Sequence, residues 1–191
     1  MKKNLRLLIM AFLLTLAFLI AGCDGAAPVN PTAPGAPEKA TEQSQQPNTA
    51  SNPERTMQLV VYHATKDAMF LVPETHKVPV NSQPARTAIE LLQAGTQNPA
   101  LVSVMPAGAK VKNLTVKDHI AYVDFDDKLI KKNVGGSTSE TLLVGAIVNT
   151  LTQFPDIHKV QILVDGKKID TISGHMDTSE PLSRSEKIIK K

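Results

Sequence analysis

The strongest hydrophobic pattern of the chain lies within residues 137–166. Large apolar side chains recur every four positions along 143–151, and this spacing predicts an amphipathic helix of about three to four turns. The helix is expected to end at Pro155-Asp156. Apolar and polar residues then alternate over 160–164, as in a half-buried strand, and Asp165-Gly166 predicts a hairpin turn. We therefore expect a helix lying on a sheet as the core unit.

The preceding part of the chain shows both the helical and the strand period. Apolar and β-branched runs predict two strands that pair across a turn at Lys66-Asp67, at residues 57–63 and 68–78. Pro73 places the second strand at a sheet edge or at a bulge. Pro84 and Gly95 stand where a helix is expected to begin and to end. A short turn of helix is expected at 101–104.

A second hairpin is predicted across Lys117-Asp118, from strands at residues 110–116 and 119–125. A charged connection at 126–133 leads to the central helix, and a short last strand is expected at 168–172. The order β-β-α-β-β-α-β predicts an α+β two-layer sandwich, with two helices on one face of a largely antiparallel sheet. The predicted domain covers 56–172. Residues 173–191 are polar and basic and are predicted to form a frayed tail.

Helices on one face leave the other face of a sheet open. Apolar side chains that gather on such a face suggest a partner. The strand alternation assigns five residues to this candidate interaction surface: Val60, Tyr62, Ile120, Tyr122 and Leu163.

Two features of the central helix carry local predictions. Ser137-x-x-Glu140 has the form of a capping box, in which the two side chains bond to each other's free backbone amides. Asn149 interrupts the apolar stripe of the helix. It is expected to hydrogen-bond a neighbouring loop or to mark an interface.

Residues 1–22 have a basic start, an apolar run and small residues, as in a cleaved secretory signal. The segment Ile20-Ala21-Gly22-Cys23 resembles the lipobox of bacterial lipoproteins. That resemblance implies cleavage before Cys23 and a diacylglycerol with further acyl chains, such as palmitate, on its sulfur. The alternative is an uncleaved anchor helix with an incidental cysteine. Asp24 would favour retention at the inner membrane in an organism with two membranes.

The charge balance of the remaining chain argues against nucleic-acid binding. The chain carries 21 basic and 18 acidic residues, and three of the basic ones lie in the signal. The rest is nearly neutral, whereas nucleic-acid binding needs clustered excess Lys and Arg. Cys23 is the only cysteine, so we expect no disulfide and no thiolate metal site. No cofactor is expected apart from the lipid on Cys23.

Residues 23–55 are rich in Pro, Ala and Gln and hold few large apolar residues. Such a segment has nothing to pack, so it is predicted to be a disordered tether. It would let a folded domain stand away from the membrane, as a spacer without a binding motif of its own.

Six phrases of the chain, in their order and spacing, closely resemble the GerMN domain: Phe70-Leu-Val-Pro-Glu74, Ala88-Ile-Glu-Leu-Leu92, Ser103-Val-Met-Pro-Ala-Gly108, Ala121-Tyr-Val-Asp-Phe125, Ile147-Val-Asn-Thr-Leu151 and Val160-Gln-Ile-Leu-Val-Asp-Gly166. This module is named after a sporulation and germination protein of spore-forming bacteria. The resemblance covers residues 57–172. It implies a domain of membrane-attached extracytoplasmic proteins, without assigned catalytic residues, similar in layout to the ring-building motifs of secretion and sporulation assemblies. The germination protein resembles a pair of such domains, and this chain has one.

Three groups of polar residues are candidates for chemistry. Five histidines lack the spacing of a zinc site and are expected to be ordinary surface or strand-end residues: His63, His76, His119, His158 and His175. Asp124, Asp126 and Asp127 form a carboxylate cluster that is expected to be solvated or to cap a turn, with acid–base catalysis or weak cation binding as alternatives. The Gly-Gly-Ser-Thr-Ser run that contains Ser137 and Ser139 lacks the lysine of a phosphate-binding loop.

We therefore expect a non-enzymatic lipoprotein on the outer face of the bacterial cytoplasmic membrane. Its domain would bind an envelope protein or self-associate, in a role related to sporulation or germination. Two alternatives remain. One is a lipoprotein that binds cell-wall fragments or another small solute, and the other is a cell-wall hydrolase.

Overall fold

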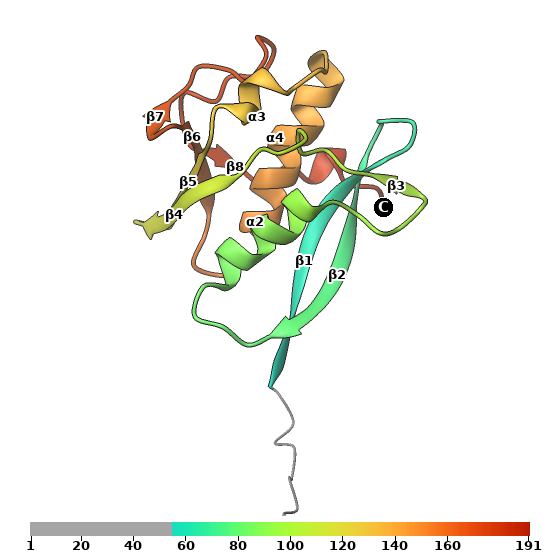
Figure 1. The fold of residues 1–191 in the computed structure, drawn as a ribbon, viewed down its shortest axis with the longest axis vertical. Helices are drawn as coiled ribbons and strands as arrows, with labels where there is room; N and C mark the ends of the chain where they lie inside the picture. The colour runs from blue at the N-terminus through green and yellow to red at the C-terminus, as the bar shows by residue number, and fades with distance from the viewer. Residues whose placement is uncertain (1–54) are drawn as a thin grey trace, which may run out of the picture. The chain divides into compact units, whose positions relative to one another are not determined.

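The structure, a computed structural model, describes residues 55–191. The predicted signal, the predicted lipidation site Cys23 and the predicted tether up to residue 54 lie outside the described residues. Figure 1 shows the described part as two groups of strands with helices between them. No helix within residues 55–191 has the length and apolar content needed to cross a membrane.

The first sheet is built on the predicted hairpin. It has the order β2-β1-β3, and all of its pairs are antiparallel. Its strands are β1 (Thr56–Thr65), β2 (Leu71–Pro79) and β3 (Leu101–Val102). β2 lies at the sheet edge, which confirms the position predicted from Pro73, a residue with no amide to donate to a ladder. β3 forms where a turn of helix was expected, so that prediction is wrong: the segment pairs with the end of β1 instead.

The second sheet has the order β4-β5-β6-β7, and β8 also pairs with β6. Its strands are β4 (Val111–Lys117), β5 (Ile120–Phe125), β6 (Lys159–Val164), β7 (Lys167–Lys168) and β8 (Leu182–Ser183). β5 and β6 are parallel, because the chain crosses between them through a helix. The turns at Asp118-His119 and Asp165-Gly166 have positive φ at both positions, as the tight turns of hairpins require.

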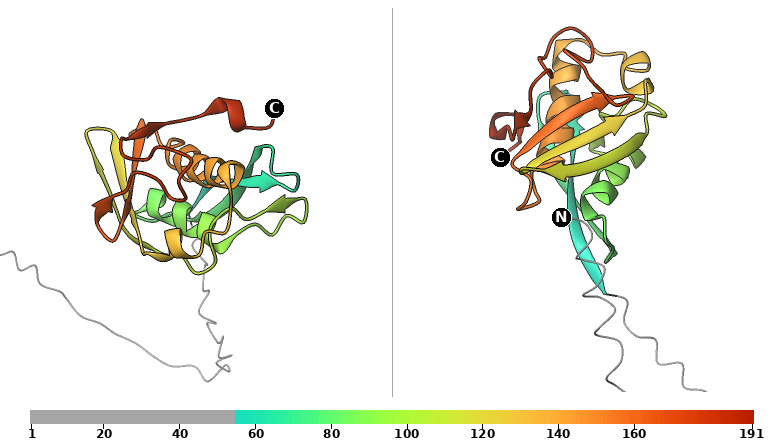
Figure 2. Two further views of the ribbon diagram at one scale, coloured as in Figure 1. Left: turned by 90° about the horizontal axis from the view of Figure 1, so that it is seen from above. Right: turned by 90° about the vertical axis from the view of Figure 1, so that its left-hand side faces the viewer.

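The helices are α2 (Pro84–Ala94), α3 (Lys128–Lys131) and α4 (Ser137–Leu151), with the 3-10 turn η1 (Glu186–Ile188) near the end of the chain. α3 lies in the segment expected to be a plain connection. α4 packs against β1 and β2 on one side and β6 on the other, and the views in Figure 2 show it between the two groups of strands. Every residue of α4 from Leu142 to Leu151 is accordingly buried.

The α+β class and the predominance of antiparallel pairing are confirmed. The structure adds a division that the pattern did not predict, because the β1–β2 hairpin forms its own sheet instead of joining β4, β5 and β6. Apolar side chains from both sheets and from α2 and α4 form one core. Its largest fully buried members include Phe125, Leu71, Ile89, Leu143 and Ile147.

Candidate interaction site

The turn between β1 and β2 carries two large apolar side chains at the surface. The Thr65 hydroxyl donates to Asp67 Oδ1 at 2.5 Å and accepts from the Phe70 amide at 3.1 Å. Asp67 also accepts from the Met69 amide at 3.1 Å. The hydrogen bond from Thr65 has the largest effect on the pKa of Asp67, and together with the bond from Met69 it holds this pKa below its usual value. The polar groups thus tie the turn together and leave Met69 61% and Phe70 38% exposed.

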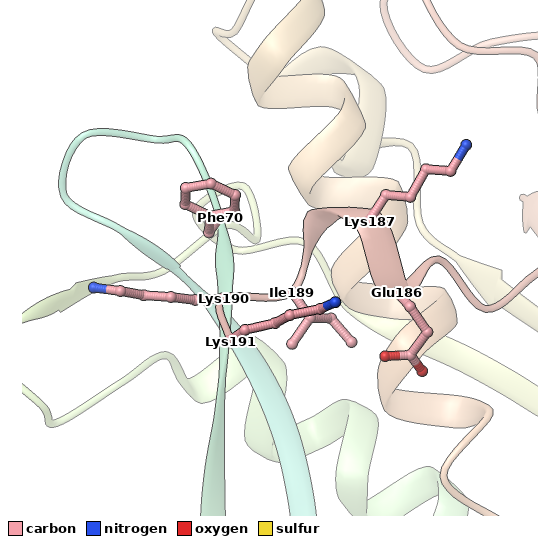
Figure 3. Close-up of a pocket in the computed structure, with 6 residues that line it drawn as sticks. All are labelled: Phe70, Glu186, Lys187, Ile189, Lys190 and Lys191. Carbon is pink, nitrogen blue, oxygen red and sulfur yellow. The ribbon is translucent and has the colours of Figure 1, made fainter.

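The end of the chain packs beside this turn. Ile189 forms a parallel bridge with Leu71, and the Lys190 amide donates to the Leu71 carbonyl at 2.8 Å. Between the two segments lies a hollow of about 600 Å³, which we name the C-terminal pocket (Figure 3). Its lining residues are Phe70, Glu186, Lys187, Ile189, Lys190 and Lys191.

Hydrogen bonds to α4 and β1 hold the last segment in place. Asn149 bonds twice to Ser185: its Oδ1 accepts from the Ser185 amide at 2.9 Å, and its Nδ2 donates to the Ser185 carbonyl at 3.0 Å. This confirms the prediction that Asn149 bonds a neighbouring loop. Arg184 donates to the Tyr62 hydroxyl at 2.6 Å and to the Asn149 carbonyl at 3.0 Å. Its guanidinium carbon lies 5.2 Å from the centre of the Tyr62 ring.

The segment 173–191 is therefore not a frayed tail, and that prediction is wrong. Its polar composition concealed apolar residues that pack against the core, with Ile188 and Ile189 among them. Leu182 pairs with Val160 at the edge of β6. Contacts with the rest of the domain occur along the whole segment, from the loop after β7 to Lys190.

The five residues assigned to one open sheet face do not form one surface. Tyr62 is only 3% exposed, because Arg184 and α4 cover it, so its assignment to the surface is wrong. Val60 and Tyr62 belong to the first sheet, whereas Ile120, Tyr122 and Leu163 belong to the second. These other four side chains are half-buried. The segment after β7 covers part of the second sheet, where Gln161 Nε2 donates to the Thr178 carbonyl at 2.9 Å.

The predicted capping box does not form. Gly136 is the N-cap of α4, and no side chain caps the helix. The Glu140 carboxylate is fully buried and instead accepts three amides of the loop after β7: those of Ile172 and Ser173 at 2.9 Å and that of His175 at 2.8 Å. Three amides satisfy a buried carboxylate better than one amide at a helix end, which explains the departure from the local pattern.

Burial would raise the pKa of Glu140, but the hydrogen bonds from Ser173, His175 and Ile172 outweigh it and hold this pKa below its usual value. Glu140 therefore stays ionised in the folded protein at neutral pH. Glu140 holds the loop at 172–175 against α4, and Asn149 holds Ser185 against the same helix.

The histidines are spread over the molecule. His63 is fully buried, His76 Nε2 lies 2.8 Å from Glu74 Oε1, and the exposed rings of His119 and His158 stack with centroids 4.5 Å apart. His175 lies in the loop bound by Glu140. Within the described part of the chain, no group of three or more His, Cys, Asp or Glu side chains is arranged to hold a metal ion.

The carboxylates of the predicted cluster each serve a local contact. Asp124 Oδ1 accepts from the Gly166 amide at 2.7 Å, and Asp126 Oδ1 accepts from the Lys110 amide at 3.1 Å. Asp127 lies 2.5 Å from the Lys131 ammonium, and this hydrogen bond holds the pKa of Asp127 below its usual value. Ser137 and Ser139 lie in the first turn of α4. The cluster thus closes turns and connections, as the simpler interpretation expected.

Met69, Phe70 and Ile189 were not singled out from the sequence. Phe70 fitted the alternation of a strand, and Ile189 lay in a segment dominated by lysine. Two neighbouring large apolar residues directly after the predicted turn at Lys66-Asp67 were the available signal for the first two. The contact of Ile189 with Leu71 had no local signal.

Comparisons with known proteins agree with the resemblance to the GerMN domain. The chain is similar to several solved structures, and two of them are structures of GerMN domains. One is the tandem GerMN domains of the sporulation protein GerM from Bacillus subtilis, with 26% identity and a TM-score of 0.59, covering 68% of this chain and 46% of that chain. The other is the first GerMN domain of the same protein, with 27% identity and a TM-score of 0.58, covering 67% of this chain and 98% of that chain.

The chain thus spans less than half of the tandem structure and nearly all of the single domain. A search of the curated proteins finds no match to the sequence. The model of the Germane family, described as sporulation and spore germination, matches residues 60–170. Because this match extends over more than half of the sequence, the chain belongs to the Germane family.

Proposed function

We propose that this chain is a lipoprotein anchored through Cys23 to the outer face of the cytoplasmic membrane, where its GerMN domain binds another envelope protein without catalysing a reaction. The lipobox-like Ile20-Ala21-Gly22-Cys23 supports the anchor. Membership of a family described as sporulation and spore germination supports a role in one of those processes. The tandem structure holds two such domains, so a pair formed by self-association is the nearest variant of this proposal.

The single observation that carries the binding role is the apolar turn beside the C-terminal pocket. An exposed methionine and a half-exposed phenylalanine stand next to a hollow. Val80 and Val134 in loops and Val116 on β4 are other exposed large apolar residues, and they stand singly, as is normal on soluble domains.

The position of this turn fits an anchored protein. The chain begins β1 at Thr56 and reaches the turn after Thr65, and a strand of that length extends about 33 Å. The turn therefore lies at the opposite end of β1 from the point where the anchored segment joins the domain (Figure 1). An anchor at Cys23 would leave this end free to meet another envelope protein.

Site-specific photo-crosslinking tests the binding role. A photoreactive amino acid replaces Met69 in the full chain, which is expressed in its own envelope and irradiated. We expect a discrete protein adduct from position 69. The same amino acid at Lys117, an exposed residue at the end of β4, serves as the control and should give none. Adducts to lipid alone, or equal adducts at both positions, would contradict a protein-binding role for the turn.

The anchor is tested by Cys23→Ala. We expect the N-terminal peptide of the unchanged protein to begin at Cys23 and to carry the mass of the lipid. The variant should have neither the lipid nor the cleavage before position 23, because both need the cysteine. Mass spectrometry of the N-terminal peptides measures both effects. An uncleaved N-terminus without lipid in the unchanged protein would instead support an anchor helix.

A further inference from the structure

We propose that the C-terminal pocket binds an acidic segment of the partner protein, which inserts one apolar side chain between Phe70 and Ile189. This inference rests on the proposed function, because it specifies the partner's chemistry at the same surface. The floor of the pocket would make the apolar contact, and the charged groups around it would select the partner.

The floor of the pocket is apolar and fixed. Phe70 closes the hydrogen-bonded turn after β1, and Ile189 is held by its bridge to Leu71. Figure 3 shows Ile189 near the centre of the view and Phe70 above it, with the side chains of Lys190 and Lys187 extending to opposite sides and that of Lys191 crossing Ile189. A hollow of about 600 Å³ is large enough for one or two side chains, and ligand pockets of proteins fall in this range.

The rim of the pocket is basic. Lys187, Lys190 and Lys191 are exposed, and within residues 55–191 none of them forms an ion pair. Two nearby side-chain carboxylates are already engaged. Glu186 pairs with the Arg184 guanidinium, and Asp67 accepts bonds from the turn that carries Met69.

A partner that brings Asp or Glu to this rim would gain attraction from three ammonium groups. A basic partner would be repelled by them. Complementary charge of this kind selects partners and steers their encounter.

The shape of the pocket favours a protein segment over a lipid surface. A bilayer is broad and flat, so it would contact the exposed Met69 side chain and leave the hollow empty. An extended segment can fill the hollow with a single side chain while its acidic neighbours reach the lysines on either side.

The test pans a displayed library of random heptapeptides against the full lipidated chain in nanodiscs of zwitterionic lipid. We expect enriched peptides to carry Asp or Glu around one large apolar residue. An enriched peptide is then labelled, and its binding is measured by fluorescence anisotropy at increasing salt. Affinity should fall by about tenfold or more in the double variant Lys187→Glu/Lys190→Glu, and also in a peptide whose apolar residue is alanine. Salt should weaken binding to the unchanged protein.

The double variant Lys77→Glu/Lys117→Glu changes the net charge equally at exposed positions on β2 and β4. It should bind as the unchanged protein does. A library without enrichment, enrichment without acidic bias, or equal loss in both double variants would overturn the proposal. Vesicles with phosphatidylglycerol provide a further comparison: charge-dependent binding to them without peptide binding would assign the pocket to a lipid surface.

The two proposals fail in different ways. A protein adduct at position 69 that is unchanged in the Lys187→Glu/Lys190→Glu variant would retain the binding role and overturn the acidic partner. Absence of any protein adduct at position 69 in the unchanged protein would overturn the binding role itself.

Discussion

Glu140 is a charged residue in a fully buried position, and its three amide partners explain how the fold tolerates it. A carboxylate without partners would be costly in this environment. Hydrogen bonds to a charged group are stronger than those to a neutral one, and here they join α4 to the loop at 172–175. The residue therefore links two parts of the chain that are distant in sequence.

Glu140→Gln is expected to lower the free energy of unfolding by about 1–3 kcal/mol, because a neutral amide cannot accept the three bonds equally well. Urea denaturation at pH 7 measures this loss. Glu90→Gln removes a carboxylate that pairs with Arg86 on the exposed surface of α2, and it should change stability by less than about 1 kcal/mol. Equal effects of the two substitutions would contradict the role of Glu140.

Glu140 also makes the stability of the fold depend on pH in the acidic range. Since its pKa is lowered in the folded state, its contribution to stability is complete above the unfolded-state pKa. It is lost as the pH falls through the folded-state pKa, because the unfolded chain takes up the proton first. Urea midpoints measured from pH 6 downward should therefore fall less steeply in Glu140→Gln than in the unchanged protein.

His63 makes the stability of the fold depend on pH near neutrality as well. Burial, which is the largest effect, lowers its pKa, while Glu74 acts to raise it and His76 to lower it. Neither ring nitrogen has a hydrogen-bond partner among residues 55–191. The unfolded chain binds the proton more readily, so stability should decrease as the pH falls below about 6.5.

His63→Phe should remove this decrease while leaving the fold intact. Urea midpoints between pH 5 and pH 7 measure the slope, which should become flatter in the variant. His158→Phe, which removes an exposed histidine instead, provides the matched control. A slope that is unchanged in His63→Phe would show that other groups cause the dependence.

These residues show where a local pattern stops being informative. Ser137-x-x-Glu140 was compatible with a capping box, but the partners of Glu140 lie 32 residues and more along the chain. No spacing in the sequence announces them. The prediction for Asn149 was correct because an amide on an apolar stripe has to find a partner wherever that partner comes from.

Among the helices, α4 has contacts with both sheets: it packs against β1 and β2 of the first, against β6 and β8 of the second, and against α2. Gly145 lies in its middle, and a Cβ built there would lie 2.2 Å from the Ile188 Cδ1 atom. The absence of a side chain at Gly145 thus leaves room for Ile188 to pack against α4. Glycine lowers the stability of a helix interior, and here the close approach of Ile188 explains its presence.

Gly145→Ala is expected to displace Ile188, and protection of the Lys190 amide from hydrogen exchange should fall as the last segment loosens. The double variant Gly145→Ala/Ile188→Val lacks the conflicting methyl group and should restore protection. It should also gain up to about 1 kcal/mol from the better helix former. Hydrogen exchange with mass spectrometry measures the first effect and urea denaturation the second. Loss of protection in both variants would show that the contact with Ile188 is not the cause.

The elements themselves were predictable where a period continued over several residues. The strand alternation of Ala121, Val123 and Phe125 and the four-residue spacing of α4 gave the correct elements, and Asp165-Gly166 gave the correct turn. The pattern did not predict how strands combine into sheets. The pairing of β3 with β1, in place of a helical turn at 101–104, depends on a neighbour that the local sequence does not contain.

For the whole molecule, residues 184–191 bring several contacts to the core. Deleting them is expected to lower the free energy of unfolding by about 2–4 kcal/mol, from the lost burial of Ile188 and Ile189 and the lost bonds of Arg184 and Ser185. Removal of Lys191 alone should have almost no effect. Urea denaturation of the two truncated chains measures the difference, and equal stability of both would show that the segment contributes little.

The candidate site could be predicted only in part. An interaction surface was expected, but it was placed on a sheet face that the segment after β7 partly covers. The turn with Met69 and Phe70 is local and could be found from its sequence. The pocket forms only when Ile189 lies beside Leu71, so it depends on a contact between distant segments that hydrophobic periodicity does not encode.

Arg184 and Tyr62 are 122 residues apart, and this separation bears on how the protein matures. Long-range contacts form late, because closing a long loop must precede any gain from the contact. A chain exported with its N-terminus leading would present Tyr62 well before Arg184. The hairpin and α4 would then wait for their final partners until synthesis and translocation were nearly complete. A chain released too early would leave the Tyr62 ring uncovered and the Leu71 carbonyl unpaired, so the last few residues would determine whether an exported chain completes its fold.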